Sequence, residues 1–112
     1  MILNDISFHD SKILQVTENP KEQSLDFLLD FPTDWDANIY EKRTLRFSEV
    51  ITYHLNEIPF SGPPSILEIN FFGEVEKQFG PDNNKIKTSR LKVEIQTNSG
   101  NRIIEFMDCN FI

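Results

Sequence analysis

The sequence contains a single cysteine, Cys109, together with two histidines and four glycines among its 112 residues. One cysteine excludes an intramolecular disulfide, and no apolar run approaches the roughly 18 residues of a membrane span. Positive charge is also scarce: 11 basic against 18 acidic residues give a net charge of −7. The longest basic cluster is Lys42-Arg43, followed by Arg46. Because phosphate backbones attract clustered Lys and Arg, binding to nucleic acid or to an anionic membrane is disfavoured.

Residues 1–5 have neither the basic start nor the apolar run of a signal peptide. With the lone cysteine, this predicts a reducing, cytoplasmic location of the bacterial type. The length fits a single domain over residues 1–112, and ten Phe residues and one Trp supply a large apolar area for its core. The acidic charge favours a basic protein partner, mainly through the rate of association.

Alternation of apolar and polar residues predicts a mainly β fold. The clearest strand is 24–31, which places Leu25, Phe27, Leu29 and Phe31 on one face. Further strands are predicted over 12–17, 44–47, 65–76, 89–97 and 102–112, with turns or loops over 19–22, 32–42, 59–64, 80–84 and 98–101. The inward faces are expected to carry Leu14 and Val16 in the first strand, Leu67, Ile69, Phe71, Gly73 and Val75 in 65–76, and Leu91, Val93 and Ile95 in 89–97.

Residues 48–56 are compatible with two interpretations. A β-bulge near Ser48-Glu49 would restore the strand register, whereas a short helix would place Val50, Ile51, His54 and Leu55 at helical spacing. Either way, the count is six or seven strands with at most one or two short helices. Hairpin-like connections predict an antiparallel meander that forms a curled sheet, a sandwich or a partly open barrel.

His9 and Asp10 are the first candidates for chemistry, since a carboxylate beside an imidazole could orient a base or begin a metal site. Neighbouring residues of a strand point to opposite faces, however, and no motif places His54 beside them. A structural role in the turn before the first strand is favoured for His9 and Asp10. Cys109, within an apolar strand, is typical of a small buried residue. We therefore expect no catalytic residue, no metal and no cofactor, and a protein that is not an enzyme.

The best candidates for binding a partner are loop residues. Asp34 and Asp36 flank Trp35, Tyr40 follows in the same predicted loop, and Phe60 lies in a Pro-Gly loop. Large aromatic side chains are enriched at protein interfaces, and acidic neighbours suit a basic partner. These residues either contact a partner or close the open ends of the β core, and the sequence favours neither role.

Two segments are informative in combination. Residues 7–13, Ser-Phe-His-Asp-Ser-Lys-Ile, precede the first strand, and residues 45–50, Leu-Arg-Phe-Ser-Glu-Val, lie in a later one. In this order, with an aromatic C-terminal strand, the chain resembles small all-β bacterial immunity proteins of polymorphic toxin systems, in particular immunity-protein family fifty. The resemblance spans most of the chain and implies a protein that neutralises a cognate toxin by masking its active surface. The acidic charge suits a basic, nuclease-like toxin.

Two other hypotheses remain open. A small-molecule or carbohydrate-binding β module would use Trp35, Tyr40 and the acidic loops around a concave pocket. A hydrolase or metal enzyme would need His9, Asp10 and His54 close together. A free edge strand could also pair two copies of the chain, so the expected state is a monomer or a weak homodimer.

Overall fold

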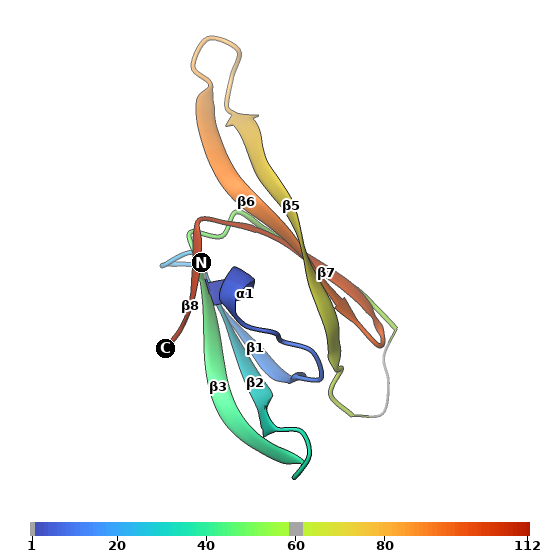
Figure 1. Ribbon diagram of the computed structural model, residues 1–112. Coiled ribbons are helices and arrows are strands. Elements are labelled where there is room, and N and C mark those ends of the chain that lie inside the picture. Colours follow the sequence, from blue (N-terminus) through green and yellow to red (C-terminus); the bar gives the residue numbers. More distant parts are fainter. Residues whose placement is uncertain (1, 59–61) are drawn as a thin grey trace.

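The computed structural model spans residues 1–112 and describes all of them except residues 1 and 59–61, so Phe60 lies outside the described residues. Two four-stranded antiparallel sheets pack face to face and do not close into a barrel (Figure 1). The fold is therefore the predicted antiparallel β class, in its sandwich form with one very short helix. The elements are α1 Ile2–Asp5, β1 Lys12–Asn19, β2 Ser24–Asp34, β3 Ile39–Ser48, β4 Thr52–Glu57, β5 Ile66–Phe79, β6 Ile86–Thr97, β7 Gly100–Phe106 and β8 Asp108–Phe111.

The first sheet has the strand order β1-β2-β3-β8 and the second has the order β4-β7-β6-β5. The chain passes from one sheet to the other twice, between β3 and β4 and between β7 and β8. These two crossings are hydrogen-bonded to each other. The Met107 amide donates to the Ser48 carbonyl at 3.0 Å, and the Ile51 amide donates to the Glu105 carbonyl at 3.0 Å. One corner of the sandwich is thereby fixed by backbone contacts.

The core lies between the two sheets and is built around three fully buried phenylalanines, Phe27, Phe47 and Phe106. The rings of Phe27 and Phe47 meet edge to face at 5.3 Å, and those of Phe47 and Phe106 at 4.9 Å. Such pairs add to the free energy gained by burial alone. The predicted alternation over 24–31 is confirmed, because the four apolar residues of its predicted inward face are all buried.

Two of the predicted inward residues, Leu14 and Leu67, are wrong because each lies at a β-bulge, whereas Val16 and Ile69 pack against the core as predicted. In β1 the shift falls between Ile13 and Gln15, so Ile13 is buried and Leu14 is 36% exposed. In β5 the first shift follows Ile66, which is buried, while Leu67 is 45% exposed. Because each bulge inserts one residue, inward residues are three positions apart there: Ile13 and Val16 in β1, and Ile66 and Ile69 in β5.

Three predicted boundaries also differ from the structure. The loop over 32–42 is reduced to a turn at 35–38, because β2 continues to Asp34 and β3 begins at Ile39. Residues 52–57 form strand β4 and no helix, after a joint in which Glu49 has a φ of +52°. The predicted final strand is two strands, β7 and β8, because the chain changes sheet at Met107. The described residues thus contain eight strands instead of six or seven.

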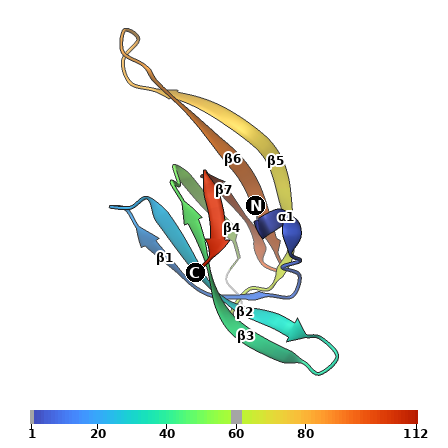
Figure 2. The same ribbon diagram turned by 60° about the vertical axis from the view of Figure 1, so that its left-hand side comes forward.

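The hairpin of β5 and β6 extends far beyond the sandwich as a curved arm (Figures 1 and 2). Because of this arm the molecule is elongated, with dimensions of 59 × 28 × 26 Å. Near its tip Phe79 pairs with Ile86, and both side chains are exposed. No helix within the described part of the chain is long and apolar enough to cross a membrane.

Candidate functional site

The turn before β1 and the β2–β3 turn meet at one end of the sandwich. The rings of His9 and Trp35 lie edge to face, with centroids 6.3 Å apart. His9 Nδ1 donates to the carbonyl oxygen of Leu67 in β5 at 2.8 Å, and His9 Nε2 lies 3.4 Å from Asp10 Oδ1. Three segments distant in the sequence therefore form one surface around Trp35.

The contact between His9 and Asp10 corrects the expectation that they point to opposite faces. That expectation assumed strand geometry, whereas Asp10 has a φ of +67° and lies in a turn. The Asp10 amide donates to the Ile66 carbonyl at 2.9 Å, and the Ser11 amide donates to the Phe8 carbonyl at 3.0 Å. These bonds fix the turn against the first residue of β5 and so set the position of the His9 ring.

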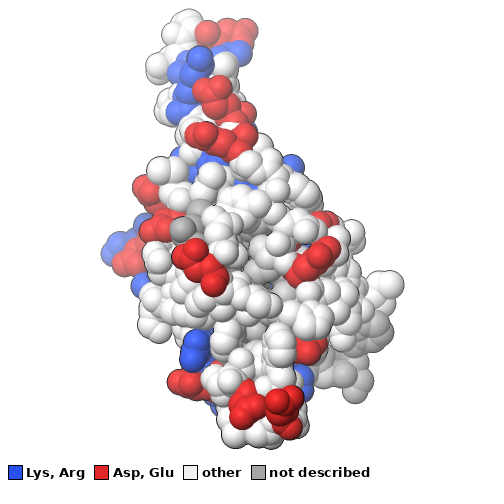
Figure 3. Space-filling view, viewed as in Figure 1, with Lys and Arg blue, Asp and Glu red and all other residues white. Residues whose placement is uncertain are grey.

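The β2–β3 turn presents Trp35 between two carboxylates. Asp34 Oδ1 accepts a hydrogen bond from the Ala37 amide at 3.1 Å, and the Asn38 amide donates to the Trp35 carbonyl at 3.2 Å. Trp35 is 59% exposed, and Asp34 and Asp36 are also exposed. Acidic side chains gather over this end of the molecule (Figure 3). Within the described residues, no cation forms an ion pair with Asp34 or Asp36.

Tyr40 lies close to this turn but outside its hollow. It pairs with Pro32 in the β2–β3 ladder, and the Lys12 ammonium lies 5.3 Å from the centre of its ring. The hollow beside Trp35, about 330 Å³ in volume, is lined by Pro32, Thr33, Asp34, Trp35 and Asp36. The two aromatics therefore do not line a shared pocket, which the hypothesis of a carbohydrate-binding module needs.

The structure does not bring the two histidines together. His54 pairs with Ile103, Ile103 with Glu94, and Glu94 with Asn70 across the second sheet. His54 is therefore on β4, three strand spacings (about 14 Å) from β5, which His9 contacts. Cys109 is fully buried, and burial raises the pKa of its thiol. Across the described residues, no group of three or more His, Cys, Asp or Glu side chains could bind a metal.

A groove between the edge strands β1 and β4 was not predicted from the sequence. It has a volume of about 690 Å³, within the range of roughly 300–1,000 Å³ typical of ligand sites. Its apolar lining is Ile13, Leu14, Val16, Leu55, Pro63 and Pro64, and its polar lining includes Gln15, Glu18, Tyr53 and Arg102. No pattern in the sequence indicates this groove, because it depends on which strands form the edges of the two sheets.

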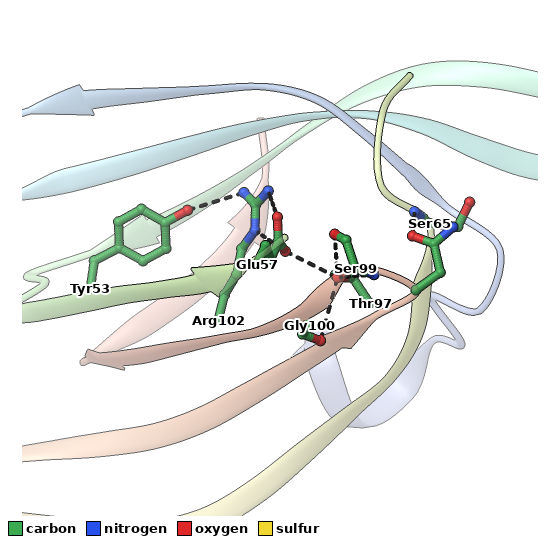
Figure 4. A network of polar contacts seen from close by, with 8 residues as sticks. Tyr53, Glu57, Ser65, Thr97, Ser99, Gly100 and Arg102 are labelled. Atoms are coloured by element: carbon green, nitrogen blue, oxygen red, sulfur yellow. Dashed lines mark hydrogen bonds and ion pairs between the residues drawn. The ribbon is translucent and has the colours of Figure 1, made fainter. Parts of the chain in front are cut away.

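The floor of the groove is a buried polar network (Figure 4). Arg102 Nε and Nη2 donate to the two carboxylate oxygens of Glu57, each at 2.7 Å, and Arg102 Nη1 donates to the Tyr53 hydroxyl at 3.1 Å. The Thr97 hydroxyl also donates to Glu57, at 3.0 Å. Burial by itself would raise the pKa of Glu57, but the hydrogen bonds and charge of Arg102 outweigh burial and lower it. This network stabilises an ion pair and leaves no free general base.

Comparison with protein-family models gives no match for this chain, and comparison with curated protein sequences gives no match either.

Proposed function

We propose that the protein is a non-catalytic binding protein, an immunity protein that neutralises a basic, nuclease-like bacterial toxin by covering its active surface. The observation that carries the proposal is the exposed Trp35, which lies against His9 and between two exposed carboxylates. We refer to Trp35, Asp34, Asp36, His9 and Asp10 as the Trp35 surface. Its partner is a protein of opposite charge.

The geometry of this surface suits tight association. The turn that carries Trp35 is fixed by its own hydrogen bonds, so little backbone freedom remains to be lost on binding. Tryptophan is among the residues most often found to dominate binding energy at protein interfaces. Asp34 and Asp36 are exposed and available to Lys or Arg of a partner.

The charge of the whole molecule supports the same partner. A net charge of −7 produces a field that accelerates the approach of a basic protein. Rapid capture matters for an inhibitor, because a toxin acts until it is bound. We place this inhibitor in the cytoplasm of the toxin-producing cell and its kin.

The test uses a catalytically inactive form of the basic protein encoded next to the gene for this chain. Binding kinetics are measured for the wild type, Trp35→Ala and the double variant Asp34→Asn/Asp36→Asn. Trp35→Ala should weaken binding by roughly thirtyfold, about 2 kcal/mol, mainly through faster dissociation. The double variant should slow association and reduce its dependence on salt.

Ile86→Ala provides the matched control, since it removes an exposed apolar side chain from the arm. This control should bind like the wild type. Equal affinity of the wild type and Trp35→Ala would contradict the assignment of the surface. Failure of the wild type to bind or neutralise the toxin would contradict the function itself.

A further inference from the structure

Part of the free side of edge strand β1 is already occupied by the chain itself. The Ile66 amide donates to the Ser11 carbonyl at 2.7 Å, and the Ile13 amide donates to the Pro64 carbonyl at 2.9 Å. Lys12 and Ser65 form an antiparallel bridge between these two bonds. Residues 64–66 thus act as a short added strand on β1 and show that this edge accepts backbone pairing.

This added strand stops where the chain reaches its prolines. Pro63 and Pro64 have no backbone N–H, so they cannot donate to the next positions of β1. From Gln15 to Asn19, no strand of the described residues pairs with this side of β1. β4, on the opposite side of the groove, is also an edge strand. The unpaired part of β1 is about 17 Å long, enough for an added strand of about five residues.

The groove beside this edge has the chemistry of a peptide site. Leu14, Val16 and Leu55 give it apolar walls, and Leu55 is 57% exposed. The Tyr53 hydroxyl accepts its hydrogen bond from Arg102, so its own proton is available to a carbonyl oxygen. Backbone pairing with pockets for alternate side chains is the usual way in which a sheet edge binds an extended peptide.

Charge in the groove defines one further feature of the occupant. Arg102 is neutralised by Glu57 inside the sandwich, whereas Glu18 is exposed on the groove wall. We propose that the groove binds an extended peptide segment of a partner protein, antiparallel to β1, in line with residues 64–66. Its side chains are apolar at alternate positions, and a Lys or Arg near its N-terminal end lies opposite Glu18. The groove shares no lining residue with the Trp35 surface, so this site is distinct from the one proposed for a toxin.

The test selects binders from a library of random ten-residue peptides displayed on yeast. The library is enriched on the wild-type protein and depleted on Leu55→Glu, which places a charge in the groove at an exposed position. Selected peptides should alternate apolar residues and carry a basic residue in their N-terminal half. Leu55→Glu should lower the affinity for a synthetic peptide of the selected sequence at least tenfold. Glu18→Lys should also lower this affinity, and selection on that variant should favour peptides with acidic residues.

Two controls locate the bound peptide. Ile86→Glu introduces the same charge at an exposed apolar position of the arm and should leave affinity unchanged. Amide hydrogen exchange should slow at residues 15–19 when the peptide binds, and methylation of alternate peptide amides should abolish binding.

Three results would overturn the peptide site. Absence of any enriched peptide that distinguishes the wild type from Leu55→Glu would do so. Loss of peptide binding in Trp35→Ala, with binding to Leu55→Glu unaffected, would show that the peptides bind the Trp35 surface. A homodimer in sedimentation that Leu55→Glu dissociates would assign the groove to a second copy of the chain. Failure of the toxin experiment would leave this result unchanged, because the two tests use different variants and different ligands.

Discussion

Arg102 of β7 and Glu57 of β4 form a bidentate ion pair inside the sandwich, with both N–O distances at 2.7 Å. Their side chains are 8% and 10% exposed. Arg102 also lies 5.9 Å from the centre of the Phe27 ring, so the pair connects an edge strand of one sheet with the core strand of the other. Only a small part of either side chain is therefore in contact with solvent.

Removal of one partner should therefore be costly. We expect Arg102→Ala to lower the free energy of unfolding by about 3–5 kcal/mol, since it leaves the Glu57 carboxylate buried without a counterion. The double variant Arg102→Met/Glu57→Met should recover most of this loss, because neither charge remains. Urea unfolding measures both. Lys85→Ala, which removes an exposed ion pair with Asp82, should give no measurable change.

Stability should fall in acid. The pKa of Asp26 is lowered mainly by its hydrogen bond from Arg46. The pKa values of Glu57 and Glu105 are raised by burial but lowered more by their hydrogen-bonding partners, chiefly Arg102 and Lys77. The unfolded chain therefore takes up protons at a higher pH than the folded one. The stability from these groups should be complete above about pH 5 and be lost as pH falls through the folded pKa values.

Urea unfolding between pH 7 and pH 3 measures this dependence. Glu57→Gln should reduce its slope, since it removes one carboxylate whose pKa differs between the two states. A wild-type stability that does not vary over this range would contradict the assignment of these carboxylates.

Gly100, the first residue of β7, is required by a close approach of two strands. It has a φ of +150°, and a Cβ atom there would lie 2.1 Å from the Asn56 carbonyl oxygen of β4. We expect Gly100→Ala to destabilise the protein by about 2–3 kcal/mol, because backbone must move. Gly73→Ala is the control: its φ is +85°, but no atom lies within 4 Å of the added Cβ. That variant should lose about 1 kcal/mol from backbone strain alone. Equal shifts in melting temperature would exclude the steric explanation.

Cys109 should report on opening of the core. It is fully buried, and burial raises the pKa of its thiol, so the folded protein should react with a disulfide reagent about a thousandfold more slowly than the unfolded chain. The absorbance of the thiolate released from the reagent, followed with and without urea, gives both rates. Fast labelling of the folded protein would show that β8 detaches readily from β3.

The sequence predicted the strands whose alternation is not interrupted. Residues 24–31 could be predicted because Phe27 and its apolar neighbours recur at every second position and all enter the core. The outward positions of Leu14 and Leu67 could not, because a bulge changes the register without leaving a local pattern. The loop over 32–42 was predicted too long because its residues are polar. In the structure β2 and β3 remain paired there through backbone hydrogen bonds, with little apolar burial.

The candidate sites were predictable in part. Trp35 and its two carboxylates could be selected from residue type alone, but their contact with His9 depends on how the two turns meet. The groove could not be predicted, since it requires knowing that residues 12–19 and 52–57 are edges of facing sheets. Arg102 was predicted only as the first residue of a strand over 102–112, and that prediction did not indicate its inward position.

The pairing of β8 with β3 has a consequence for synthesis of the protein. Leu45 pairs with Phe111, so 111 − 45 = 66 residues separate them in the chain. When β3 leaves the ribosome, the strand that will cover its edge has not been made. At about 5–20 residues per second, β3 waits roughly 3–13 s for the 111 − 48 = 63 residues that follow it. During this interval the edge of β3 in the nascent chain is unpaired, which makes the incomplete first sheet a substrate for chaperones.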